Sequence, residues 1–308
     1  MVPQLFHLPV MERLLNYSNP EIPEGINYSK EHPLKEFFLL VVGVLLFFLS
    51  LVLILGVLAE FLASYVPFSA ELKIVALQKS DEQPEAQAIE NYLQTLAGRL
   101  AAVQGLPEGM TVKVHYVDSD SINAFATLGG QIVVFRGLLD IVPDENTLAM
   151  VIAHEIAHIK LRHPIKGLGR AVVIGTAIAM FNGGAGNDIV TDVLGEAGLL
   201  TALKFSRDQE RAADAIALQA LARVYGHIGG AGEVFRLLQQ QHEKTGLITP
   251  EFFNTHPLTE NRIEEINVMA NNNNWPTMGF MVDLPPAFSQ WLHQAREVED
   301  GSGGQGLL

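Results

Sequence analysis

The feature that most restricts the fold of this chain is an uncharged apolar stretch near its N-terminus. From Phe37 to Ala59 the sequence reads FFLLVVGVLLFFLSLVLILGVLA, and Ser50 is its one polar side chain. As a helix, these 23 residues would extend over about 35 Å, enough to cross the hydrocarbon core of a membrane. A buried core helix of this length would carry a polar stripe. We therefore expect a transmembrane helix at 37–59.

The position of this stretch argues against a cleaved signal peptide. It begins after 36 residues, exceeds the length of a signal-peptide apolar region, and is followed by no small-x-small cleavage site. Lys30 and Lys35 precede it, whereas Glu60 and Glu71 follow it. This asymmetry predicts a single-pass anchor with a cytoplasmic N-terminus and the large C-terminal part outside, on the periplasmic side in a bacterium. The absence of cysteine is compatible with that compartment.

The composition excludes nucleic acid as a partner. The formal net charge is −14, and no run of lysine and arginine occurs. A protein that binds nucleic acid needs a basic surface to neutralise the phosphates. Without the apolar stretch and a tail, roughly 230 to 250 residues remain, which suffices for one large core or two small ones.

The chain divides into five parts by composition. The first and last are tails: residues 1–36 contain five prolines, and residues 301–308 read GSGGQGLL, which predicts disorder. Between them lie the transmembrane helix at 37–59, a connecting segment at 60–81 and a folded domain at 82–300.

Periodicity within the folded domain predicts many helices and a few short strands. Apolar residues from Ile89 to Val103 recur at spacings of three and four, which predicts a helix that begins near Glu82 and stops at Gly105. Alternation predicts a strand at 111–117, and Gly129 and Gly130 predict a turn within a strand pair at 124–135. Further helices are expected at 144–162, capped by Asp144, and at about 188–224, 231–243, 259–270 and 285–297.

A second apolar stretch, from Ala171 to Phe181, has only 11 residues. It is too short to span a bilayer. We expect a buried or surface helix, and contact with the membrane is the alternative.

The pentapeptide His154-Glu155-Ile156-Ala157-His158 is the central chemical signal. On a helix, residues four apart lie on the same face, so both imidazoles can bind one metal ion. Glu155 lies beside them, where it can accept a proton from metal-bound water. Because apolar residues flank the motif, burying the two histidines and the glutamate without a partner would be costly. The motif predicts a zinc site with Glu155 as the general base.

A catalytic zinc needs a third protein ligand and a free position for water. The best candidate is Glu210, on a predicted helix about 50 residues downstream. Asp214 lies one turn further on the same face and can accept a hydrogen bond from the free ring nitrogen of a ligand histidine. Asp208 is the alternative third ligand.

Four motifs, in this order, resemble those of the HtpX-like and CAAX-prenyl-protease family of gluzincin-type zinc metallopeptidases. They are N-A-F-A at Asn123–Ala126 with G-G-Q-I-V-V-F-R-G-L-L after it, H-E-I-A-H at His154–His158, S-R-x-x-E-x-x-A-D at Ser206–Asp214, and H-P-x-x-x-x-R-I at His256–Ile263. The resemblance implies a mainly helical α+β fold, a zincin-like domain with a small sheet over the two zinc-ligand helices, and endoproteolytic activity. Members that span the membrane several times differ from this chain, which has one strong candidate helix. The difference favours a single-pass quality-control protease over processing of prenylated peptides.

The resemblance also gives a role to the strand around Asn123, Ala124 and Phe125. An exposed strand edge beside the metal can pair with an extended substrate. Core packing of Phe125 and Val133 is the alternative, and both can hold at once.

Two further histidines can be assessed from their positions. His256 precedes Pro257 ahead of a predicted helix, so it can reach the metal from the open side. We expect it to stabilise the tetrahedral intermediate, as Arg262 also could, or to occupy the fourth coordination place at rest; capping of the following helix is the alternative. His163 would be turned about 140° from His158 on a continuous helix, which predicts a structural or surface position.

These residues together predict a membrane-anchored endopeptidase with one Zn²⁺ per chain and protein or peptide substrates, in envelope protein quality control. Zinc would activate water and polarise the scissile carbonyl. One competing interpretation is a latched or conditionally active protease that acts mainly as a chaperone or assembly factor. Another is a zinc hydrolase of very short peptides.

Overall fold

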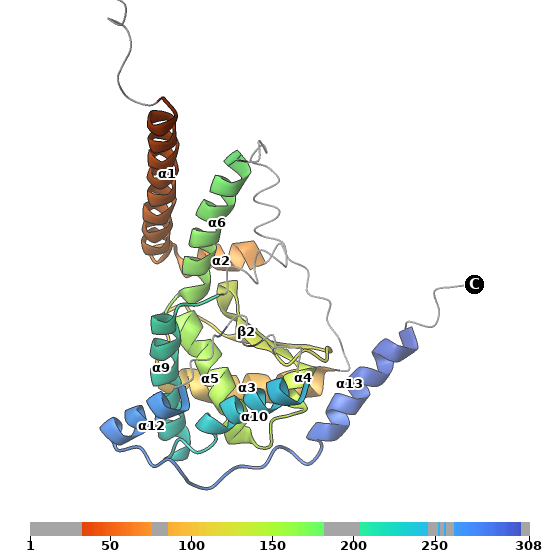
Figure 1. Cartoon of the computed structure of the whole chain (residues 1–308). Coiled ribbons are helices and arrows are strands. Elements are labelled where there is room, and N and C mark those ends of the chain that lie inside the picture. The colour runs from red at the N-terminus through yellow and green to blue at the C-terminus, as the bar shows by residue number, and fades with distance from the viewer. Residues whose placement is uncertain are drawn as a thin grey trace, which may run out of the picture. The chain divides into compact units, whose positions relative to one another are not determined.

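The computed structural model describes residues 33–75, 86–181, 204–245, 252, 256 and 262–302. Their contacts divide the chain into two units, Met1–Ser50 and Leu51–Leu308. Helices and strands are labelled in Figure 1. Residues 1–32 of the tail predicted at 1–36, residues 303–308 of the tail predicted at 301–308, and the start of the helix predicted at about 188–224 lie outside the described residues.

Helix α1, Pro33–Ala63, contains the predicted transmembrane stretch. It is the one helix among the described residues that is long and apolar enough to cross a membrane. Its leucines, valines and phenylalanines are largely exposed. A run of exposed apolar side chains over this length is suited to lipid rather than water. The prediction of one N-terminal apolar helix is confirmed.

The segment expected to be a mere connection contains a helix that the sequence did not predict. Helix α2, Phe68–Val75, begins directly after Pro67 and buries the side chain of Glu71. It packs against η3, the 3-10 turn Leu128–Gly130. The segment after α1 is therefore part of the folded domain.

The first helix of the domain core is α3, Gln87–Gln104. The side chains that established its periodicity, Ile89, Leu93, Leu96 and Leu100, are all 0% exposed. It ends at Gly105, whose φ of 63° is left-handed, as predicted from the glycine. Residues 76–85, where the helix was expected to begin, lie outside the described part of the chain.

Three short strands form one mixed sheet in the order β1-β3-β2. Strands β1 (Lys113–Val117) and β3 (Gln131–Phe135) are parallel, whereas β2 (Ala124–Ala126) and β3 form the predicted antiparallel pair. Gly129 and Gly130 turn the pair with φ of 65° and 71°. A Cβ on Gly130 would lie 1.9 Å from the carbonyl oxygen of Thr111, so this position requires glycine.

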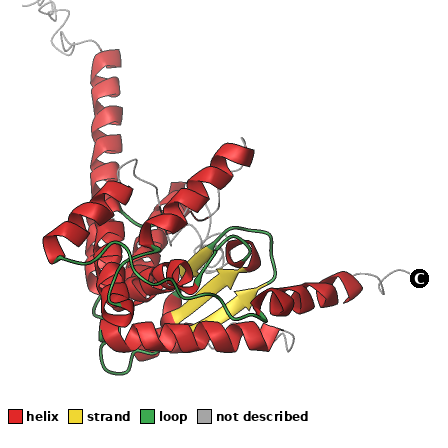
Figure 2. Ribbon diagram, turned by 90° about the horizontal axis from the view of Figure 1, so that it is seen from below, coloured by secondary structure: helices red, strands yellow, loops and turns green. Residues whose placement is uncertain are grey.

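The sheet packs on α3 and on α5, Glu145–Lys160 (Figure 2). Asp144 caps α5 as predicted, because its side chain accepts a hydrogen bond from the backbone N–H of Thr147 at 2.8 Å. Every residue of α5 from Glu145 to Ile159 is buried. The polar residues of the HEIAH motif therefore lie in the interior of the domain.

Helix α9, Arg207–Tyr225, packs against α5 and begins with a capping box formed by Ser206 and Gln209. The remaining elements are α4 (Arg136–Leu139), α6 (His163–Phe181), α10 (Ala231–Thr245), α12 (Arg262–Asn273) and α13 (Phe288–Ser302). Helix α13 includes the first two residues, 301 and 302, of the predicted C-terminal tail. The mainly helical α+β fold with a small sheet over α5 is confirmed.

Candidate active site

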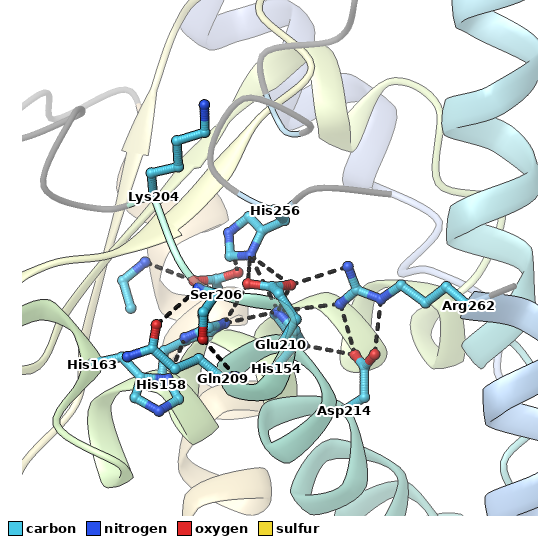
Figure 3. Close-up of polar contacts among 12 residues, drawn as sticks. His154, His158, His163, Lys204, Ser206, Gln209, Glu210, Asp214, His256 and Arg262 are labelled. Carbon is cyan, nitrogen blue, oxygen red and sulfur yellow. Dashed lines mark hydrogen bonds and ion pairs between the residues drawn. The ribbon is translucent and has the colours of Figure 1, made fainter. Parts of the chain in front are cut away.

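The two histidines of the HEIAH motif point the same way from α5. The Nε2 atoms of His154 and His158 lie 2.9 Å apart. Both side chains are buried, with exposed fractions of 2% and 0%. The i, i+4 spacing therefore brings two nitrogen donors to one point in the interior (Figure 3).

Helix α9 brings Glu210 to the same point. Its carboxylate oxygens lie 3.4 Å from His154 Nε2 and 3.5 Å from His158 Nε2. Asp208, the alternative third ligand, has a side chain that is 95% exposed and pairs with Arg211. The structure therefore brings Glu210 to the histidines and leaves Asp208 at the surface.

His256 joins this group from a different part of the chain. Its Nδ1 lies 3.0 Å from Glu210 Oε1 and 3.2 Å from His154 Nε2. The ring of His256 stacks on the ring of Phe252. The backbone N–H of His256 donates a hydrogen bond of 2.8 Å to the backbone carbonyl of Phe252. One ligand atom from each of His154, His158, Glu210 and His256 lies within 4.8 Å of the others. Residues 257–261 are not described, so capping of the next helix by His256 is not tested.

A second layer of polar groups holds two of these side chains, His154 and Glu210. Asp214 Oδ1 lies 2.9 Å from His154 Nδ1, on the opposite side of the ring from Glu210. Arg262 donates two hydrogen bonds of 2.8 Å to Asp214, and its Nη1 lies 3.0 Å from Glu210 Oε2. The guanidinium also lies over the ring of Phe235, 4.4 Å from its centroid. Arg262 is thus engaged with carboxylates, which favours positioning over oxyanion binding.

His163 holds the other ligand histidine, a role that the sequence did not reveal. Its Nδ1 lies 2.8 Å from His158 Nδ1, and it is 4% exposed. The prediction that His163 is turned about 140° away from His158 assumed one continuous helix through both residues. In the structure, Arg162 has a left-handed φ of 63° and interrupts the helix between the end of α5 at Lys160 and the start of α6 at His163. Phe205 adds a stacking contact to His158, with ring centroids 4.1 Å apart.

Glu155 lies beside the cluster and is fully buried. Its Oε2 accepts a hydrogen bond of 2.7 Å from the N–H of Ala126 in β2. Its Oε1 lies 3.4 Å from His256 Nε2 and has no hydrogen-bond partner among the described residues. Burial raises the pKa of Glu155 above the usual range of a carboxyl. A carboxylate with one anchored oxygen, one free oxygen and a raised pKa is suited to accept a proton.

The charges of the cluster depend on one another. Burial alone would lower the pKa of His154, but the carboxylates of Asp214 and Glu210 outweigh it and raise the pKa to about 9. Burial alone would raise the pKa of Glu210, but His256 and His154 hold it well below the usual range. Burial and the neighbouring His154 lower the pKa of His158. The cluster therefore contains an ionised carboxylate, Glu210, and a neutral imidazole, His158, the forms that bind metals, whereas His154 would have to release a proton to bind one.

The separations of the donor atoms test whether zinc would fit. In a tetrahedral site with zinc–ligand distances of about 2.0–2.2 Å, neighbouring donors lie about 3.3 Å apart. The separations among His154, His158 and Glu210 are 2.9, 3.4 and 3.5 Å. Two imidazoles and a carboxylate are also a donor set typical of catalytic zinc. The residues present fit a zinc ion.

The three residues expected to bind substrate take different positions at β2. Asn123 is buried, and its carbonyl accepts a hydrogen bond from Phe135 N–H in β3, as part of the sheet. Phe125 pairs with Val133. Backbone groups alternate along an antiparallel strand, so Ala124 and Ala126 face away from β3, as the bond from Ala126 to Glu155 shows. Ala124 is therefore the one of the three whose backbone faces away from β3, at the edge of the sheet, although it is 0% exposed.

The sequence profile of peptidase family M48 matches residues 87–270, from α3 to α12. The match covers more than half of the chain and includes all four residues of the cluster. The chain belongs to peptidase family M48. This confirms the family resemblance based on the four motifs, and it makes zinc the expected metal, because M48 metallopeptidases are zinc-dependent.

Several curated M48 proteins are similar to this chain. Mitochondrial metalloendopeptidase OMA1 of Saccharomyces cerevisiae is 28% identical over 206 residues, which are 64% of this chain and 52% of the relative. The beta-barrel assembly-enhancing protease is 30% identical in Yersinia pestis and 32% identical in Escherichia coli K12, in each case over 59% of this chain and 39% of the relative. The matches thus span about half or less of each relative. They support a membrane-associated metalloprotease.

Proposed function

We propose that this chain is a membrane-anchored zinc endopeptidase in which His154, His158 and Glu210 hold the metal and Glu155 is the general base. One observation carries the proposal: the free Oε1 of Glu155 faces a buried group of two histidines and a glutamate. A purely structural site has no use for an adjacent buried carboxylate with a free oxygen. The arrangement instead meets the needs of catalysis.

The chemistry that zinc supplies when bound is activation of a water molecule and polarisation of the scissile carbonyl. The side chains supply proton transfer and orientation. Glu155 Oε1 takes a proton from the water and delivers it to the leaving amine, while the N–H of Ala126 fixes the other oxygen. Asp214 and His163 fix the ring orientations of His154 and His158.

The edge of β2 that faces away from β3 supports cleavage of extended chains rather than very short peptides. A substrate strand can pair with the outward backbone of Ala124, and Ala126 beside it connects that edge to Glu155. A dipeptide would leave most of this edge unpaired. Comparison of casein with dipeptides as substrates tests this part of the proposal: faster cleavage of dipeptides would contradict it.

His256 occupies the place from which a fourth ligand would approach. Since Nδ1 of His256 lies close to both His154 Nε2 and Glu210 Oε1, we propose that His256 would hold the metal as a fourth ligand at rest, before substrate binds. Stabilisation of the tetrahedral intermediate is the alternative role. A resting state of this kind corresponds to a conditionally active protease.

The setting of the activity is also a proposal. The charges that flank the apolar helix differ in sign: Lys30 and Lys35 precede it, and Glu60 and Glu71 follow it. This distribution favours a catalytic domain on the outer side of the membrane. One group of relatives is named for enhancing beta-barrel assembly, and another for mitochondrial endopeptidase activity. These names support a role in quality control of envelope proteins.

A further inference from the structure

A buried carboxylate on the segment that follows the membrane helix is not used by the reaction described above. Glu71, on α2, is 4% exposed. Burial raises its pKa, while Gly129 N–H and Arg162 act in the opposite direction. Burying an ionisable group is costly unless it is paired. The two partners of the Glu71 carboxylate therefore show which parts of the fold it connects.

The first partner belongs to the turn of the β2–β3 pair. The N–H of Gly129 donates a hydrogen bond of 2.9 Å to Glu71 Oε2. The turn is in close contact with α2, because a Cβ on Gly129 would lie 3.1 Å from a methyl group of Val75. Three residues before Gly129, Ala126 donates its hydrogen bond to the general base Glu155. Glu71 thus holds the turn from which the substrate-facing strand extends.

The second partner belongs to the end of the zinc helix. Arg162 Nη1 lies 2.8 Å from Glu71 Oε1, Nη2 donates to the carbonyl of Val66, and the guanidinium lies 5.9 Å from the centroid of Phe68. A left-handed φ is unfavourable for a residue other than glycine, and Arg162 has this φ. The contacts of its guanidinium offset that cost. The next residue is His163, which holds the ring of His158.

We propose that Glu71 is a positioning residue of the peptidase, which together with Arg162 fixes strand β2 in register over the zinc helix α5. The proposal rests on the function proposed above. On this proposal, α2 helps to position the active site and does not merely connect the peptidase domain to α1. Glu71 and Arg162 touch neither substrate nor metal. They act by connecting α2, the β2–β3 turn and the end of α5.

The test uses the full-length chain in detergent, as wild type, Glu71→Gln and Arg162→Gly. Glutamine retains an acceptor for Gly129 but loses the charge that pairs with Arg162. Glycine adopts the left-handed φ of position 162 without strain, so this variant preserves the turn while it removes the guanidinium. Glu145→Gln is the matched control, because Glu145 is also buried and ion-paired, with Arg99 at 2.6 Å, at the opposite end of α5.

We expect Glu71→Gln and Arg162→Gly to retain zinc and to exchange the backbone amides of Ala126–Gln131 with deuterium faster than the wild type. Their KM for an extended peptide should rise roughly tenfold, with a smaller change in kcat. Glu145→Gln should not alter KM or this exchange. The proposal would be overturned if deuterium exchange and KM were unchanged in both Glu71→Gln and Arg162→Gly, or if Glu145→Gln showed the same changes as they do. If the wild type cleaves nothing, the proposed peptidase function fails. The deuterium-exchange measurement alone then decides whether Glu71 and Arg162 fix strand β2.

Discussion

The Nδ1 atoms of His158 and His163 lie 2.8 Å apart, so the ring of His158 is held on its Nδ1 side by a second histidine, while its Nε2 faces Glu210. His154, in contrast, is held by Asp214. The two ligand rings are thus oriented by groups of different charge. Burial and the nearby Lys166 lower the pKa of His163 to about 3, so His163 is neutral and one nitrogen of the pair can donate to the other.

Replacement of His163 by alanine should weaken zinc binding by about 10–100-fold, because the ring of His158 loses the group that fixes its orientation. Competition with a chelator of known affinity measures the change. His227→Ala is the matched control, since His227 is also buried and makes two hydrogen bonds, to Phe280 O and from Gly229 N–H. Wild-type zinc affinity in His163→Ala would show that the contact has no such role.

The two aspartates of α9 should respond differently to the same substitution. Asp214→Asn removes the charge that holds His154 and leaves Arg262 with a weaker partner, so we expect zinc affinity to fall by about 10–100-fold. Asp208→Asn changes an exposed side chain and should leave zinc affinity unchanged. Loss of zinc from the Asp208 variant would instead support Asp208 as the third ligand.

His256→Ala separates the roles proposed for this residue. If His256 fills the fourth place at rest, its removal should retain zinc and raise the rate of casein cleavage. A fall of about 10²–10³-fold in kcat would instead indicate stabilisation of the tetrahedral intermediate. An unchanged rate would exclude both roles.

The orientation in the membrane can be measured because the natural chain contains no cysteine. Met278→Cys places a thiol on a side chain that is 84% exposed in the soluble domain, and Ser29→Cys places one before the membrane helix. In intact bacterial cells whose outer membrane has been made permeable, we expect an impermeant maleimide to label position 278 and not position 29. The reverse pattern would place the catalytic domain in the cytoplasm.

The sequence predicted those parts of the molecule that depend on local periodicity. The core of α3, the capped helix α5 and the glycine turn of the β2–β3 pair follow from apolar spacing, Asp144 and Gly129–Gly130. The spacing within the HEIAH motif also implied that His154 and His158 share a face. These features needed no information from distant parts of the chain.

The features that the sequence did not predict depend on tertiary contacts. Helix α2 has eight residues, too few for a clear periodic signal, and it is stabilised by packing on the β2–β3 turn. The position of His163 depends on the left-handed φ of Arg162, an unusual conformation for a residue other than glycine. The engagement of Arg262 with Asp214 and Glu210 required the arrangement of α9 and α12 to be known.

The most direct test measures zinc content and casein cleavage together, for the full-length chain in detergent, in wild type and Glu155→Gln. A fragment beginning near Ala70 would lack Val66 and Phe68, which contact Arg162, so the intact chain is the proper material. We predict one equivalent of zinc in both proteins and cleavage by the wild type alone. No zinc in either protein, or equal cleavage by both, would contradict the assignment of this site as a zinc peptidase centre with Glu155 as its base.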